Sequence, residues 1–298
     1  MSTEDRLEVL STTLLDQHRS VVNELKRIAQ LVHLEFGWHY LLDLAWIIEN
    51  LDLAQLKNVL DAGAGVGVLQ WYLASKGINV LSVDRDDRAD LDPRFRKYFF
   101  VQGLRPQDLK AYDPWRTAFS RPGTFTQKLK GFGRDQLSML QKRSILPGSG
   151  TVTIYHQDLK TLADVPENSF DAIVAVSSLE HNAPEDLPLV VDELMRVLKP
   201  GGKLVASLST AGEADGFHAP SSGWMYSETS MKKCFKLDDS LVSNFGDYPQ
   251  MLEQIKSSAE LRDGLAKFYF RSDKGGMPRG VWNPQYVPVG VCKVKVKI

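Results

Sequence analysis

Short apolar runs alternate with helix-like stretches over the central part of the chain, and this alternation limits the fold more than any other feature. The strand-like runs are KNVLD, INVLSVD, TVTIYH, FDAIVAV and GGKLVASLS. The stretch LQWYLASKG is predicted to form a helix that ends at Gly77. Residues Pro184–Leu198 are predicted to form another, which ends at a Lys-Pro-Gly-Gly turn. Strands that alternate with helices form a mostly parallel sheet with crossover helices. We therefore expect an α/β fold built on such a sheet.

The two ends of the chain depart from this alternation. Apolar residues recur at helical spacing from about Thr3 to Gln30, which predicts an amphipathic helix with a break near residues 17–19. A second helix is expected over Tyr40–Leu51, so we divide the chain into a helical extension (1–52) and a main domain (53–298). The C-terminal KFYFRSDKGGMPRGVWNPQYVPVGVCKVKV has two strand-like runs with no helix between them, which predicts an antiparallel pair at one end of the sheet.

A long insertion (90–150) follows the second strand, where one crossover helix would suffice. Its stretch from Pro93 to Gly150 has twelve Lys and Arg residues but only three Asp, with aromatic residues between them. One interpretation is a helical elaboration with a solvated basic face. The other is a lid or platform that meets an anionic partner. Nucleic acid is the weaker candidate, because the segment has no known nucleic-acid-reading module.

Bulk properties exclude several classes of protein. The chain has 298 residues, a net charge of -1 and only two cysteines, which suits a reducing compartment and gives no disulfide framework or metal spacing. The first residues are acidic where a signal peptide would be basic, and the apolar run YLLDLAWIIENL is too short and too charged to span a bilayer. We expect a cytoplasmic protein without a bound metal; the oligomeric state stays open.

The loop after the first central strand contains three glycines in the order Asp61-Ala62-Gly63-Ala64-Gly65-Val66-Gly67. A dinucleotide loop would need a third glycine at residue 68, which is valine, and a P-loop would need a lysine that this loop lacks. An acid beside the loop would repel a pyrophosphate. The same acid would suit a ligand that carries positive charge.

The loop resembles the cofactor loop of class I S-adenosylmethionine-dependent methyltransferases. Asp84 ends the second strand, Asp158 follows the third, and PENSFDAIVAVSSLEHN and LMRVLKPGGKLVASLS resemble the family's later elements in the same order. The resemblance covers Lys57–Ser209 apart from the insertion. It implies a Rossmann-like fold, in which a seven-stranded, mostly parallel sheet has helices on both faces and its last strand is antiparallel and inserted. It also implies S-adenosylmethionine as cofactor.

The resemblance also implies roles for individual residues. Asp84 would accept hydrogen bonds from the ribose hydroxyls, and Asp158 and the Leu159 amide would face the adenine. The cofactor-binding residues predicted in this way are Asp61, Gly63, Ala64, Gly65, Gly67, Asp84, Arg85, Asp158, Leu159 and Ser177. His181, with Glu180, is the candidate for a catalytic base, and His39, Tyr40 and Trp224 are candidates for acceptor contacts. Packing or capping roles for these five residues stay open.

The function implied is methyl transfer to a small or medium-sized acceptor. The basic insertion favours oxygen on an anionic or glycan-like molecule. Two alternatives stay open: a methyltransferase acting on RNA or protein, and a cofactor-binding docking domain without activity.

Overall fold

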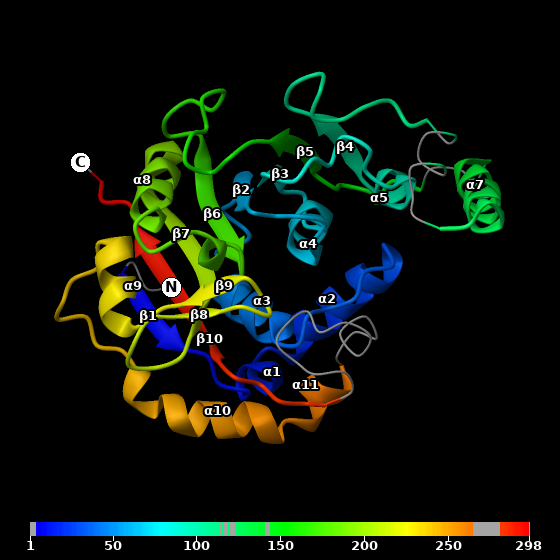
Figure 1. Ribbon diagram of the computed structural model, residues 1–298. Helices are drawn as coiled ribbons and strands as arrows, with labels where there is room; N and C mark the ends of the chain where they lie inside the picture. The colour runs from blue at the N-terminus through cyan, green and yellow to red at the C-terminus, as the bar shows by residue number, and fades with distance from the viewer. Residues whose placement is uncertain are drawn as a thin grey trace.

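A twisted sheet forms the centre of the molecule in the computed structural model (Figure 1). The structure describes residues 4–113, 115, 119, 123–140, 144–264 and 281–297. Eight strands pair in the continuous order β1-β10-β7-β6-β2-β3-β5-β4, and the β8–β9 hairpin pairs with β7 through β9. The strands are β1 (Arg6–Val9), β2 (Asn58–Ala62), β3 (Asn79–Asp84), β4 (Phe100–Gly103), β5 (Thr151–His156), β6 (Phe170–Val176), β7 (Leu198–Thr210), β8 (Gly216–His218), β9 (Gly223–Met225) and β10 (Val287–Val294).

The five central strand-like runs of the sequence are confirmed as β2, β3, β5, β6 and β7, all of which pair in parallel. The strand β10 runs antiparallel to both β7 and β1, between which it lies. The continuous order holds one strand more than the seven expected, because β4, inside the insertion, extends the sheet beyond β5.

Helices lie on both faces because the chain leaves the middle of the sheet in two directions. The neighbours β2 and β6 continue outward to β3 on one side and to β7 on the other. Right-handed crossovers in opposite directions place their helices, α4 (Val68–Ser75) and α8 (Leu187–Val197), on opposite faces. The point between β2 and β6 where the direction changes is where an open α/β sheet binds its ligand.

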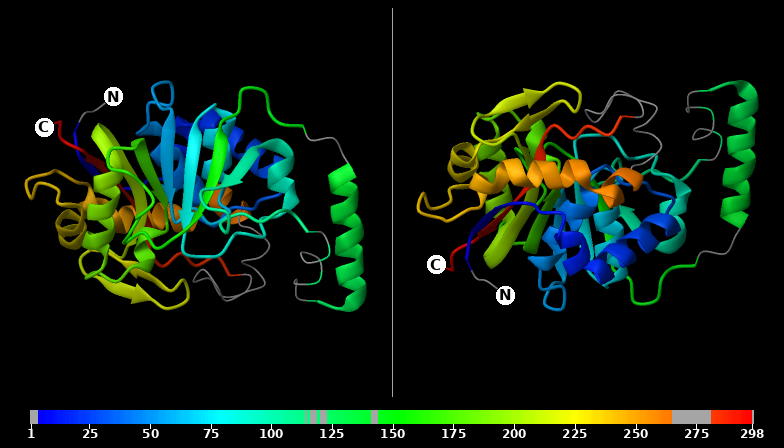
Figure 2. Two further views of the ribbon diagram at one scale, coloured as in Figure 1. Left: turned by 90° about the horizontal axis from the view of Figure 1, so that it is seen from above. Right: turned by 90° about the horizontal axis from the view of Figure 1, so that it is seen from below.

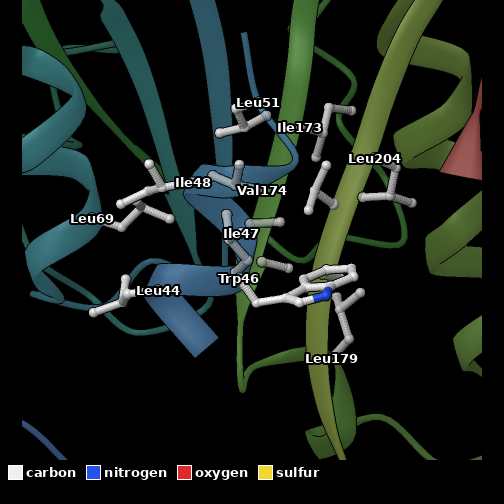
Figure 3. Close-up of a cluster of buried hydrophobic side chains, with 14 of the residues drawn as sticks. Leu44, Trp46, Ile47, Ile48, Leu51, Leu69, Ile173, Val174, Leu179 and Leu204 are labelled. Atoms are coloured by element: carbon white, nitrogen blue, oxygen red, sulfur yellow. The ribbon is translucent and has the colours of Figure 1, made fainter. Parts of the chain in front are cut away.

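The helix α3 (Tyr40–Glu49) forms the core on one face. Residues Leu41–Ile48 are all buried, as expected for a helix that is apolar on every side and lies between a sheet and further helices. Its side chains pack against residues of β6, β7 and α4, among them Ile173, Leu204 and Leu69 (Figure 3). The helices α1 (Leu14–Gln17) and α2 (Arg19–Leu31) cover α3 and α4. Asp43 is the one acidic residue within this buried stretch.

The prediction of a helix from Thr3 onward is wrong for its first turns, although the predicted break falls at His18, between α1 and α2. Residues Arg6–Val9 form the strand β1, in which Leu7 and Val9 are buried while Arg6 and Glu8 are partly exposed. This alternation is the strand period, and pairing with β10 satisfies the backbone groups. The division at residue 52 stays a prediction, but the N-terminal segment joins the sheet of the main domain.

The insertion contributes α5 (Pro93–Tyr98), β4 and α7 (Phe125–Leu140). The helix α7 stands beyond the β4 edge of the sheet, where it contacts α5 (Figure 2). In the C-terminal region the structure has α9 (Glu228–Phe235), α10 (Tyr248–Ser257) and α11 (Ala259–Asp263). The first strand-like run of the predicted C-terminal pair, KFYF, lies outside the described residues. Among the described helices, none has the length and apolar character needed to cross a bilayer.

Candidate functional site

A cavity of about 890 Å³ opens at the carboxyl ends of β2, β3, β5 and β6, at the switch point of the sheet. Residues from the N-terminal segment before α3 and from the loop of the β8–β9 hairpin complete its wall. All but one of the predicted site residues line it. These are Asp61, Gly63, Ala64, Gly65, Gly67, Asp84, Arg85, Asp158, Leu159, Ser177, Glu180, His181, His39 and Tyr40.

The glycines of the loop are required by two different constraints. At Gly63, where φ is +70°, a Cβ would lie 2.4 Å from Cβ of Ser178, so only glycine lets the loop after β2 approach the end of β6. Gly65 has φ of +48°, and a Cβ there would meet only Asp84 Oδ2, at 3.9 Å. The loop therefore keeps space open above Gly65, which is what a cofactor cradle needs.

Asp84 and Arg88 hold this loop in place. The Gly65 amide donates to Asp84 Oδ2 at 2.7 Å, and the Asp86 amide donates to Asp84 Oδ1 at 2.8 Å. The buried Arg88 guanidinium donates to the carbonyl oxygens of Gly65 and Ser82, both at 2.7 Å. Each Asp84 oxygen keeps a second lone pair, so the carboxylate is positioned to accept from a ligand hydroxyl.

Asp61 carries a buried carboxyl at the floor of the cavity. Burial raises its pKa to about 7, and the charge of Asp84 adds to this while Arg88 opposes it. A buried carboxyl of this kind gains most from a positively charged ligand, which would favour its ionised form. Asp158, at the far side beyond β5, accepts from the Lys160 amide at 2.8 Å and also lines the cavity.

A buried histidine–aspartate pair adjoins the cavity, which His39 lines. His39 Nδ1 is 2.6 Å from Asp43 Oδ2, and the two side chains are 4% and 0% exposed. On the far side of the ring, Nε2 is 3.4 Å from the hydroxyl of Tyr286. The carboxylate fixes Nδ1 as the donor, so Nε2 is left as an acceptor beside the Tyr286 hydroxyl. Burial raises the pKa of Tyr286 above its usual range, so this hydroxyl stays protonated.

Glu180 and His181 follow β6 in the short helix η1 (Leu179–His181) but have different surroundings. Glu180 is buried and accepts from Ser209 Oγ at 3.1 Å. Burial and the nearby charge of Asp43 raise the pKa of Glu180 to about 8, and the Ser209 hydrogen bond opposes the shift. His181 is exposed, and its Nδ1 is 3.0 Å from the carbonyl oxygen of Ser222.

Trp224 is the predicted site residue that the structure does not bring to the cavity. It lies on β9 and packs edge-on against Phe217, with ring centroids 5.4 Å apart. Sequence reasoning missed Asp43, although an acid inside an apolar helix and four residues after a histidine was an available signal. It also missed Arg88 and Tyr286, for which no local pattern gives a signal.

The family comparison agrees with this geometry. Residues 133–206 match the family model of a methyltransferase domain, a range that includes β5, β6, α8 and most of β7. This match and the order of the strands are consistent with a class I S-adenosylmethionine-dependent methyltransferase domain. The cradle above Gly65 and the carboxyls of Asp61 and Asp84 fit that cofactor. No curated protein sequence matches the chain.

Solved structures with a similar fold have low sequence identity to the chain. A Pyrococcus horikoshii OT3 protein is 16% identical over 65% of this chain and 55% of its own length, with a TM-score of 0.32. A phosphoethanolamine N-methyltransferase 2 of Haemonchus contortus, solved with S-adenosyl-L-methionine, is 14% identical over 96% and 60%, with a TM-score of 0.42. A Mesorhizobium loti S-adenosylmethionine-dependent methyltransferase is 14% identical over 84% and 97%, with a TM-score of 0.41. The chain thus spans somewhat over half the length of the first two.

Proposed function

We propose that the protein transfers the methyl group of S-adenosylmethionine to a small or medium-sized acceptor. The observation that carries the proposal is the convergence of Asp61, Gly65 and Asp84 on one cavity that is also lined by His39, the histidine of the buried His39–Asp43 pair. When bound, the cofactor supplies an activated methyl group. The chain must then hold the acceptor in line, exclude water and remove a proton where the acceptor carries one.

The proposed cofactor contacts follow the order of the strands. Asp61 would face the ammonium of the methionine part, and Asp84 would accept from the ribose hydroxyls. Asp158 and the Leu159 amide would face the adenine. Gly63, Ala64, Gly65 and Gly67 would form the floor, with Arg85 and Ser177 at its borders. This assignment is supported by the single cavity that all of these residues line.

The proton acceptor we propose is His39, with Asp43 holding the imidazole in the tautomer that leaves Nε2 as acceptor. This arrangement follows the logic of a histidine base oriented by a carboxylate. His181 remains the alternative, because it also lines the cavity. Glu180 is a weaker base near neutral pH, because its raised pKa keeps the carboxyl largely protonated there.

The acceptor predicted from the sequence, oxygen on an anionic or glycan-like molecule, rests on the basic insertion. Of the described residues, none between 90 and 150 lines the cavity, so the site gives this acceptor no direct support. Methylation of RNA or protein stays the alternative in which the insertion would dock the partner. A cytoplasmic location, expected from the N-terminal sequence, belongs to the same proposal.

Calorimetric binding of S-adenosylhomocysteine tests the cofactor assignment. The wild-type protein and the surface variant Asp52→Asn should bind equally, whereas Asp84→Asn should bind about tenfold more weakly or worse, because a charge-assisted hydrogen bond contributes roughly 1.5–3 kcal/mol. No binding by the wild type, or equal binding by Asp84→Asn, would contradict the proposal.

Methyl transfer is then followed with S-adenosylmethionine labelled in the methyl group and a cell extract divided by mass. Label in the low-mass fraction supports a small acceptor. Label in the macromolecular fraction supports the RNA or protein alternative. Label in neither fraction supports a docking domain without activity.

A further inference from the structure

Polar side chains from distant parts of the chain form a linked network at the part of the cavity that His39, Ser177 and Glu180 line. Asp43 Oδ2 contacts both His39 Nδ1, at 2.6 Å, and Ser177 Oγ, at 3.4 Å. His39 in turn contacts Tyr286, while Glu180 Oε1 accepts from Ser209 Oγ. Helix α3, the loop after β6, strand β7 and the segment before β10 are thereby joined around one point.

Two carboxylate oxygens of this network accept no hydrogen bond from the described residues. They are Asp43 Oδ1 and Glu180 Oε2, and both are buried. A buried polar atom without a partner destabilises the fold by roughly 1–3 kcal/mol, so such atoms usually have a function. Glu180 lines the cavity and is only 5% exposed. In the free protein its raised pKa keeps the carboxyl largely protonated, and a bound cation would favour the ionised form, in which Oε2 accepts a hydrogen bond.

The charge of the cavity wall indicates which kind of donor fits. Six carboxyl groups line the cavity, against one guanidinium, that of Arg85. Four of the carboxyls and Arg85 lie beside the proposed cofactor contacts, on β2, on β3 and on the loops after β3 and β5. The other two lining carboxyls are those of Glu180 and Glu35, and the charge of the buried Asp43 is near Glu180. This excess of negative charge attracts a cation and opposes an anion.

Aromatic rings surround the same part of the cavity. Trp38, Tyr40 and Tyr286 line it together with His39, and the Trp38 and Tyr286 ring centroids are 5.1 Å apart. Aromatic faces beside a carboxylate are a suitable environment for an ammonium group, because the ring quadrupole and the carboxylate both attract it. A neutral hydroxyl would satisfy Glu180 Oε2 but would leave the negative charge of the wall unbalanced.

We propose that this part of the cavity binds the acceptor through a primary or secondary aliphatic ammonium group, which donates to Glu180 Oε2 and lies among the rings of Trp38, Tyr40 and Tyr286. The proposal rests on the proposed function, which it deepens by making nitrogen the methylated atom. The ammonium must lose one proton to expose its lone pair, and His39 Nε2 accepts that proton. The new N–CH₃ bond uses this lone pair, and the electrons of the broken C–S bond stay on sulfur.

Three probes of equal chain length test the charge preference without knowledge of the natural acceptor. Butylammonium, 1-butanol and butyrate are each added to the protein saturated with S-adenosylhomocysteine at pH 8, and binding is followed by saturation-transfer NMR of the probe. Butylammonium should bind at least fivefold more tightly than either of the others. Equal binding of the three, a preference for butyrate or butanol, or no binding of butylammonium would overturn the amine site.

The variant Glu180→Gln tests whether Glu180 binds the ammonium group. It keeps the size of the side chain but removes the charge, so butylammonium binding should weaken at least fivefold, whereas the surface variant Glu213→Gln should leave it unchanged. Unchanged binding in Glu180→Gln would remove Glu180 from the proposal. Should that variant fail to fold, the wild-type comparison of the three probes still decides the charge preference. Failure of the wild type to bind S-adenosylhomocysteine would contradict the proposed function instead.

Discussion

Glu180 should make the cofactor-free protein less stable as the pH rises. Its pKa is raised from an ordinary 4.5 to about 8 by burial and by the neighbouring charge of Asp43, with the Ser209 hydrogen bond opposing. Between these two values the unfolded chain releases a proton that the folded protein retains. Raising the pH therefore favours the unfolded state, at up to about 1.4 kcal/mol per pH unit.

Between pH 5 and pH 7 this effect amounts to roughly 2–3 kcal/mol, which is a large part of a typical stability of about 5–15 kcal/mol. The variant Glu180→Gln cannot ionise but keeps an oxygen that can accept from Ser209. The difference in the free energy of unfolding between variant and wild type should therefore grow in favour of the variant by roughly 2–3 kcal/mol over this range.

The assay is urea unfolding of the cofactor-free protein at pH 5, 6 and 7, followed by fluorescence and circular dichroism. Comparison of variant with wild type cancels the contribution of Asp61, whose pKa is also raised. The exposed carboxyl variant Glu213→Gln should show no such trend. A stability difference between Glu180→Gln and wild type that does not change with pH would refute the reasoning.

Further predictions concern the cofactor loop, the proposed base and the packing of the sheet. Because burial raises the pKa of Asp61 to about 7, its carboxyl is largely protonated below that pH. The affinity for S-adenosylhomocysteine, measured by calorimetry, should therefore fall by up to tenfold for each pH unit below 7. The variant Asp61→Asn should not show this pH dependence. His39→Gln should slow labelled methyl transfer at least a hundredfold, since a positioned base contributes roughly 10²–10⁴. His18→Gln, which alters another histidine–carboxylate pair outside the cavity lining, should leave the rate unchanged. A rate for His39→Gln equal to that of the wild type would contradict the assignment of His39 as the base. Gly290→Ala should lower the free energy of unfolding by about 1–3 kcal/mol, because its Cβ would lie 2.5 Å from the Trp46 ring; an unchanged urea midpoint would contradict this.

Local patterns in the sequence were sufficient for the parallel part of the sheet. Each of its central strands is an apolar run closed by a turn or an acid. The strand ends and the loops directly after them bring Asp61, Asp84, Asp158 and Ser177 to one edge. Parallel strands that meet at their carboxyl ends leave little freedom in where such residues lie. The convergence of the predicted cofactor residues on one cavity follows from the topology alone.

Features that depend on distant pairing could not be predicted in this way. The strand β1 is four residues long and pairs with β10, more than 270 residues further along the chain. Four alternating residues are too few to distinguish a strand from the helical spacing that follows them in the sequence. The contact between His39 and Tyr286 joins residues 247 positions apart. Asp43 was the exception, because an acid in an apolar helix is visible without the fold and indicates a buried polar partner.

The most direct test of the central claim is the electron density of the protein crystallised with S-adenosylhomocysteine. We predict the ribose hydroxyls within hydrogen-bond distance of Asp84, the adenine beside Asp158 and the sulfur directed toward His39 and Glu180. Density for the cofactor product outside this cavity, or with its sulfur directed away from His39, would contradict the account.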